Sequence, residues 1–219
     1  ERALGYLAAH RNPYGAWRYQ PRDGDADTSV TGWCVLALGS AKSFGMPVDE
    51  TALTAALAYF DSCTDERGRT GYSKRGEPSS RREGDHATRY PTERGEAMTA
   101  VALFCRYFLK EDRKEHGSMK QQEALLAAKP PVWDEANGTI DAYYWYYGSY
   151  ALFQAGGPAW IEWQKHLRTA VVATQRSDGN FLGSWDPLCA WGEDGGRVYT
   201  TAILALTLQV YYRYGKLAR

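Results

Sequence analysis

The chain has 219 residues, of which 44% are hydrophobic and 14% are aromatic, and this length is enough for one domain with a substantial core. Its 26 basic and 26 acidic side chains give a formal net charge of zero, which argues against a general nucleic-acid-binding protein with a basic surface. No apolar run approaches the roughly 20 residues of a membrane-spanning helix.

Eight helices are predicted along the chain, four amphipathic and four apolar. In chain order they cover residues 1–10, Asp27–Ser40, Pro47 to about Asp61, Arg94–Leu109, a short helix from Ser118, Asp141–Ala155, a helix from Gly157, and Arg197–Tyr214. The four that begin at Asp27, Arg94, Asp141 and Arg197 are apolar on nearly every side, which is typical of helices buried within a helical layer. Each contains an Ala-Leu pair, and these pairs indicate a repeat of roughly 50 to 60 residues.

Local signals predict where several helices begin. The Asp27-Thr-Ser cluster can cap a helix by accepting hydrogen bonds from its free N–H groups. Ser118 and Gln121 have the spacing of a capping box, and Pro158 suits a first helical position, where its missing N–H costs nothing.

The connections between these helices alternate in length. Links from an apolar helix to the next amphipathic one are short, whereas links from amphipathic to apolar helices are long. The helices divide into four hairpins at about residues 1–43, 49–109, 118–155 and 158–214. Because alternate connections of antiparallel hairpins lie at opposite ends, all long loops should share one face, beside the N-termini of the apolar helices. We predict the functional site at that face, since loops on a rigid scaffold usually carry function.

Two aromatic-glycine segments mark the junctions of helix pairs. Gly15-Ala-Trp17 follows the first amphipathic helix, and residues 175–181, QRSDGNF, follow the last. This arrangement resembles the QW repeat of squalene and hopene cyclases, and the wider resemblance is to bacterial prenyltransferase/squalene-oxidase-repeat proteins. The resemblance implies an all-α, α/α-toroid fold with apolar helices inside and amphipathic helices outside. Complete rings of this superfamily usually carry more than four pairs, so further repeats or a second subunit are expected to complete the ring, unless it stays open.

The motif that carries cyclase chemistry is only partly present. In the family, a D-x-D-D-T motif at an inner-helix start supplies an acidic Asp that protonates an alkene. Aligning the apolar residues downstream places Thr31 at the motif's Thr and Asp27 at its first Asp, so the catalytic acid falls on Ser29. A shifted register that uses Asp25 and Asp27 recovers two carboxylates but breaks the apolar match. We therefore expect Asp27 to be an N-cap, and Asp25 and Asp27 are the catalytic candidates of an active cyclase only.

No metal or cofactor is predicted. The chain lacks the D-D-x-x-D cluster that holds magnesium in class I prenyl enzymes. The zinc site of protein prenyltransferases uses Asp, Cys and His. Its candidates would be Asp186, Cys189 and one of His10, His86, His116 or His166, and their spacing does not support such a site.

The repeat register predicts which side chains line the inner mouth. Equivalent positions carry Ser29, Arg94, Tyr143 and Arg197, and one helical turn later come Trp33, Met98, Tyr147 and Thr201. The two arginines lie beside helix N-termini, which also favour anions. They suit a carboxylate, phosphate or sulfate, unless they pair with nearby acids and only fix loops. The candidate ligand-binding residues are Ser29, Trp33, Arg94, Glu96, Asp141, Tyr143, Trp145, Tyr147, Arg197 and Tyr199.

The longest loop, residues 63–91, mixes many arginines with acids, glycines and serines. This composition is typical of a solvated, mobile loop, although a lid over an anionic ligand is an alternative. His86 follows Asp85 in this loop and is expected to be a surface histidine.

The favoured function is a non-cyclising toroid module that binds a small hydrophobic or aromatic ligand with an anionic group. One alternative is an active terpene cyclase or prenyltransferase-like enzyme. Another is a carbohydrate-active α/α barrel, which needs two carboxylates about 5–10 Å apart, for example Asp27 with Asp141 or Glu96. The last is a scaffold whose groove binds a protein or peptide.

The start of the chain and its cysteines bear on its cellular context. The sequence opens within a helix-like segment without Met or a visible signal peptide, so we expect a trimmed or processed product. The four cysteines are isolated, and Cys34 and Cys105 fall in apolar helices, where a thiol is usually a small buried hydrophobe. This pattern favours a reducing compartment such as the cytoplasm and leaves a disulfide open.

Overall fold

The computed structural model describes residues 1–213, and within this range the fold is all-α. The α-helices are α1 (Arg2–His10), α2 (Thr28–Ser43), α3 (Glu50–Cys63), α4 (His86–Arg89), α5 (Ala97–Phe108), α6 (Gly117–Ala127), α7 (Ala142–Ala155), α8 (Gly157–Val171), α9 (Gly192–Leu208) and α10 (Val210–Arg213). Three short 3-10 turns are η1 (Thr92–Arg94), η2 (Val172–Thr174) and η3 (Gly179–Phe181). Tyr214, the predicted end of the last helix, lies outside the described residues.

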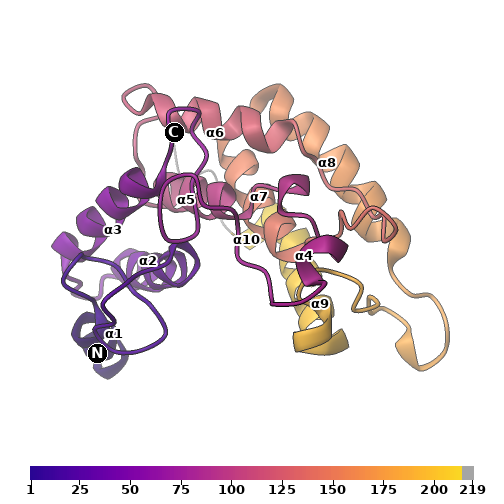
Figure 1. Cartoon of the computed structure of the whole chain (residues 1–219), viewed down its shortest axis with the longest axis horizontal. Coiled ribbons are helices and arrows are strands. Elements are labelled where there is room, and N and C mark those ends of the chain that lie inside the picture. Colours follow the sequence, from indigo (N-terminus) through magenta and orange to yellow (C-terminus); the bar gives the residue numbers. More distant parts are fainter. Residues whose placement is uncertain (214–219) are drawn as a thin grey trace.

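The four apolar helices form a continuous inner row. Helix α2 packs against α5, α5 against α7, and α7 against α9. Helices α3, α6 and α8 lie outside this row and arch over it (Figure 1). Within the described residues, α2 and α9 do not pack extensively on each other. A closed toroid therefore stays a prediction.

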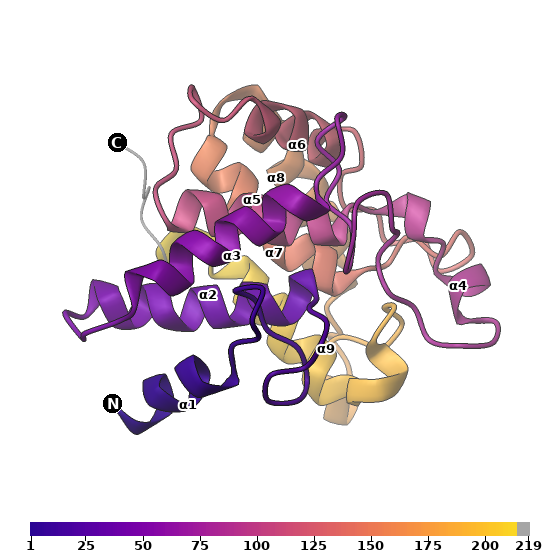
Figure 2. The ribbon, with the colours of Figure 1, turned by 60° about the vertical axis from the view of Figure 1, so that its left-hand side comes forward.

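Each outer helix packs on the inner helix that precedes it in the sequence. Helix α3 contacts α2, α6 contacts α5, and α8 contacts α7, although α6 also touches α7. This pairing differs from the hairpin division predicted above, because a short link keeps two helices adjacent while a long loop lets the next helix shift. Helix α1 lies at the edge of the two layers (Figure 2); none of its side chains is fully buried, and Leu4 and Leu7 pack against the core.

Glycines in the inner row allow helices to approach closely. A Cβ at Gly32 would lie 2.4 Å from Cγ1 of Val101, so only glycine lets α2 pack on α5 here. A Cβ at Gly148 would lie 2.7 Å from the ring of Trp163, which fills the groove between α7 and α8. The small residues that made these helices look like inner helices in the sequence therefore have a direct packing role.

The two N-caps on the inner row follow the sequence closely. Asp27 accepts a hydrogen bond from the Val30 N–H at 2.8 Å, and Asp141 accepts one from the Tyr144 N–H at 3.0 Å. One other start differs from the prediction, because helix α5 begins at Ala97 rather than Arg94. Helix α9 begins at Gly192 but breaks at Gly196, whose φ of +64° suits glycine, so its second part begins at Arg197, as predicted.

Two further findings concern the whole described range. All four cysteines are buried free thiols, as expected for Cys34 and Cys105. No helix in residues 1–213 combines the length and apolarity that crossing a bilayer requires.

Candidate functional site

A hollow of about 500 Å³, which we name the aromatic pocket, opens at the N-terminal ends of the inner helices. Six of its lining residues are aromatic: Tyr19, Trp33, Tyr72, Tyr143, Trp191 and Tyr199. Its polar lining consists of Ser29, Ser79, Ser80, Arg81 and Asp194. The structure thus brings together four of the predicted ligand residues, namely Ser29, Trp33, Tyr143 and Tyr199.

Trp33 forms a partly accessible wall of the aromatic pocket. The residue is 50% exposed although it lies on an inner helix. Tyr146 stacks with its indole at 6.4 Å between ring centroids, and Tyr147 meets it edge-on at 5.7 Å. Tyr147 in turn contacts the ring of Tyr143 at 5.0 Å. These buried rings fix the orientation of Trp33 while leaving part of its surface free.

The other predicted aromatic residues of α7 support the wall without forming it. Tyr147 is fully buried behind Trp33 and Tyr143. Trp145 is also buried, and its ring packs against Trp133 at 6.1 Å, away from the pocket lining. Burial raises the pKa of Tyr143 and of Tyr199, so both phenols are neutral near neutral pH.

Asp27 is an N-cap, and both oxygens of its carboxylate accept hydrogen bonds from the protein. It is completely buried, and besides the Val30 N–H it accepts hydrogen bonds from the Ser29 hydroxyl at 2.7 Å and from Arg18 at 3.4 Å. The side chain of Asp25 is largely exposed and lies 3.6 Å from the same arginine. Neither carboxylate lines the aromatic pocket; from the aligned motif, Ser29 and Val30 line it.

Asp141 connects the start of α7 to the long loop through Arg81. The Arg81 guanidinium donates to the Asp141 carboxylate at 3.1 Å, and both side chains are more than nine-tenths buried. Arg81 lines the pocket, whereas Asp141 lies behind it. Sequence reasoning missed Arg81 because nothing distinguishes it from its neighbouring arginines until the fold places it beside a helix cap.

The prediction of a surface histidine at position 86 is wrong. His86 is only 3% exposed, its Nδ1 accepts a hydrogen bond from the Arg82 N–H at 3.1 Å, and its Nε2 donates to the Ala190 carbonyl at 2.6 Å. These bonds assign the neutral Nε2–H tautomer. The Tyr90 hydroxyl also donates to the Leu188 carbonyl, at 3.2 Å. The loop is therefore attached to the segment before α9, a long-range contact that its composition does not reveal.

The structure does not bring Arg94 and Arg197 to the aromatic pocket. Arg94 is exposed in η1, before α5 begins. Arg197 forms an ion pair with Asp186, donates to the Ser184 hydroxyl at 3.0 Å, and lies 4.1 Å from the ring centroid of Phe181. Arg94 therefore precedes α5, and Arg197, the first residue after the break in α9, is held by Asp186 and Ser184 outside the pocket lining.

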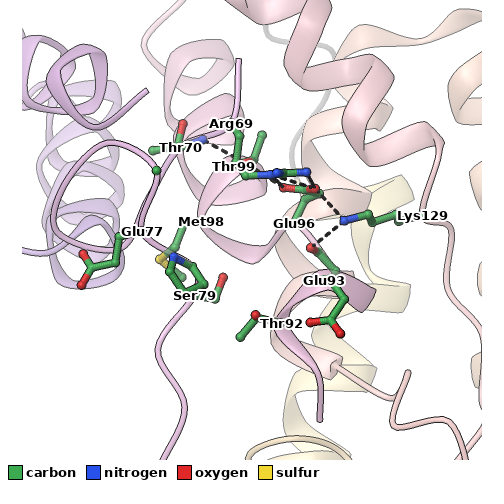
Figure 3. Close-up of a pocket in the computed structure, with 13 residues that line it drawn as sticks. Arg69, Thr70, Glu77, Ser79, Thr92, Glu93, Glu96, Met98, Thr99 and Lys129 are labelled. Atoms are coloured by element: carbon green, nitrogen blue, oxygen red, sulfur yellow. Dashed lines mark hydrogen bonds and ion pairs between the residues drawn. The ribbon is translucent and has the colours of Figure 1, made fainter. Parts of the chain in front are cut away.

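Glu96 lies in a second, smaller hollow of about 150 Å³, which we name the polar hollow. Arg69 and Lys129 both approach its buried carboxylate, each at 2.7 Å (Figure 3). The ion pair with Glu96 raises the pKa of Arg69. Ser79 and Met98 line both hollows, so the two are neighbours on the same rim.

No protein-family model matches the chain, and no curated protein gives a significant match. The resemblance to squalene and hopene cyclases therefore stays a prediction. Within residues 1–213, no group of histidine, cysteine and acidic side chains is placed to hold a metal ion. Asp186, the acid considered for zinc, is held by Arg176 and Arg197 instead.

Several pocket residues lie in loops and were not predicted. Tyr19 and Tyr72 come from the first two long loops, and their hydroxyls are 2.7 Å apart. The Arg18 guanidinium lies over both rings, at 5.1 Å and 5.4 Å from their centroids. Trp191 and Asp194 flank the start of α9. In the sequence, the aromatic residues within the long loops were the one signal that could have indicated these pocket residues.

Proposed function

We propose that this chain is a non-cyclising α/α module that binds a small, largely apolar, ring-shaped molecule in the aromatic pocket. The observation that carries the proposal is the convergence of Trp33, Tyr143 and Tyr199 from three inner helices on one hollow of about 500 Å³. This volume lies within the range of small-molecule sites, which are mostly apolar with a few polar groups. Aromatic walls of this kind suit ring faces.

The carboxylates near the pocket favour binding over cyclisation. A cyclase acid must be protonated and surrounded by apolar groups. Asp194 is the lining carboxylate among the described residues, and its side chain is 46% exposed and 3.2 Å from Arg82. Asp27 accepts three hydrogen bonds as a cap, and Ser29 occupies the position of the acid.

Charge around the pocket is balanced, so the proposal concerns an uncharged apolar body. Arg81 is paired with Asp141, and Arg82 with Asp194 and Glu193. The anionic group expected from the sequence depended on Arg94 and Arg197, which lie elsewhere. A glycosidase-like pair of carboxylates has no support either, because Asp27, Asp141 and Glu96 each bind a cation and lie outside the pocket lining.

The proposal is tested by replacing Trp33 with alanine and measuring the binding of 2-ethylnaphthalene by equilibrium dialysis. We expect about a tenfold loss of affinity, because removing a large aromatic wall costs more than about 1 kcal/mol. Phe44→Ala is the matched control, since Phe44 follows the same helix, is exposed, and lies outside the pocket. Failure of the unaltered chain to bind the naphthalene, or equal binding by Trp33→Ala, would overturn the proposal.

A further inference from the structure

We propose that the aromatic pocket selects ring compounds that carry an uncharged hydrogen-bond acceptor oxygen, such as a ketone, and that Arg81 recognises this oxygen. The inference rests on the proposed function and names the class of ligand. It assigns a specificity role to a residue in the long loop that the sequence did not single out.

The Arg81 guanidinium is buried, and only some of its N–H groups donate hydrogen bonds. Its side chain is 7% exposed, and it donates from Nε to the Tyr90 carbonyl at 2.9 Å, from one terminal nitrogen to the Ser80 carbonyl at 3.1 Å, and from the other to Asp141 at 3.1 Å. A guanidinium has five N–H donors. One N–H on each terminal nitrogen is thus without an acceptor among the described residues.

These three bonds also hold the guanidinium in place before any ligand arrives. Asp141 is itself fixed, because its other oxygen caps α7 through the Tyr144 N–H. Arg81 lines the same hollow as Trp33 and Tyr143. An incoming acceptor oxygen would therefore meet a preoriented donor while its ring lies against the aromatic walls. Such preorganisation lowers the cost of binding, and an acceptor relieves a buried N–H that has no partner.

The charge beside Arg81 favours a neutral acceptor over an anion. The Asp141 carboxylate already balances the guanidinium at 3.1 Å, and Asp194, which lines the pocket, is balanced by Arg82 at 3.2 Å. A carboxylate on the ligand would lose its hydration within a site of low polarity and would meet a guanidinium that is already paired. A ketone oxygen accepts the same hydrogen bond at a smaller cost in lost hydration.

Three naphthalenes with the same ring test the inference on the unaltered chain: 2-ethylnaphthalene, 2-acetylnaphthalene and 2-naphthoate. By equilibrium dialysis, we expect the ketone to bind about tenfold more tightly than the ethyl compound, and the carboxylate more weakly than the ketone. Equal binding of ketone and ethyl compound would overturn the inference but leave the proposed function intact. Tightest binding by 2-naphthoate would overturn the preference for a neutral group. Binding of none of the three would overturn the proposed function.

A paired variant tests the role of Arg81 itself. Arg81→Met combined with Asp141→Asn removes both charges together, so no buried charge is left unpaired, and Asn still caps α7. We expect the ketone to lose its tenfold advantage while 2-ethylnaphthalene binds within twofold of the unaltered chain, which shows that the pocket is intact. The control is Lys42→Gln with Glu50→Gln, an exposed ion pair outside the pocket lining, which should keep the ketone preference. A preference that survives in the Arg81 variant would overturn the inference.

Discussion

The aromatic pocket and the polar hollow lie side by side at the N-termini of the inner helices but differ in what fills them. Ser79 and Met98 line both hollows. In the polar hollow, Arg69 and Lys129 satisfy the Glu96 carboxylate within the protein (Figure 3). In the aromatic pocket, the walls are ring surfaces that no protein group covers completely. The comparison separates a hollow whose charges are satisfied within the protein from one that we propose to bind a ligand.

Side-chain length explains much of this difference. Asp27, Glu96 and Asp141 occupy equivalent positions before α2, α5 and α7. The two aspartates fold back and cap their helices, whereas the longer glutamate makes no cap hydrogen bond. It reaches outward to the two cations instead. Each aspartate thus combines an N-cap with one arginine, whereas Glu96 binds two cations and caps no helix.

The largest expected effect comes from breaking the polar hollow with Glu96→Ala. Removing this buried carboxylate leaves two cations without their partner, which should lower the free energy of unfolding by about 2 kcal/mol. This expected loss of stability is smaller than the loss for a fully buried ion pair because Arg69 and Lys129 are partly solvated. Urea denaturation measures the loss, and Glu93→Ala, an exposed acid of the same hollow, is the control. Unchanged stability, or a large loss of 2-acetylnaphthalene binding, would contradict the separation of the two hollows.

An intermediate effect is expected at alkaline pH from the tyrosines of the aromatic pocket. Burial raises the pKa of Tyr143 and Tyr199 above the ordinary value of about 10. Above that pH the unfolded chain has released these protons while the folded chain retains them, so the free energy of unfolding falls as pH rises. Urea midpoints between pH 8 and 11 measure this. In a variant with Tyr143→Phe and Tyr199→Phe, the urea midpoint should decrease less steeply with rising pH than in the unaltered chain. The same slope in both proteins would show that these two tyrosines do not cause the decrease.

The smallest effect is expected at the exposed rim of the aromatic pocket. Glu193 pairs with Arg82 and Arg89, and these arginines lower its pKa. Exposed ion pairs contribute little because water screens them and holding the side chains costs entropy. Glu193→Gln should therefore leave both the urea midpoint at pH 7 and the affinity for 2-acetylnaphthalene unchanged. A clear decrease in affinity would show that the rim takes part in binding.

The fold was predictable where local chemistry decides it. The mixture of small and large apolar residues predicts the inner helices. Asp27 and Asp141 cap their helices, as short acidic side chains commonly do. The pocket residues on helices, such as Ser29, Trp33 and Tyr143, could be predicted from helical register. The pocket residues in loops, such as Arg81 and Trp191, could not, because contacts between distant segments bring them to the pocket.

The sequence alone determined an all-α fold with four apolar helices and their long loops, because helix period, caps and composition act over a few residues. Only the tertiary structure decided that the inner helices pack in the order α2, α5, α7 and α9, that His86 is buried, and that Arg81 rather than Arg94 or Arg197 lines the pocket. These outcomes depend on where α5 begins, on the ion pair of Arg197 with Asp186, and on the packing of a long loop. Each is set by the balance of contacts between segments far apart in the chain, which no local pattern records.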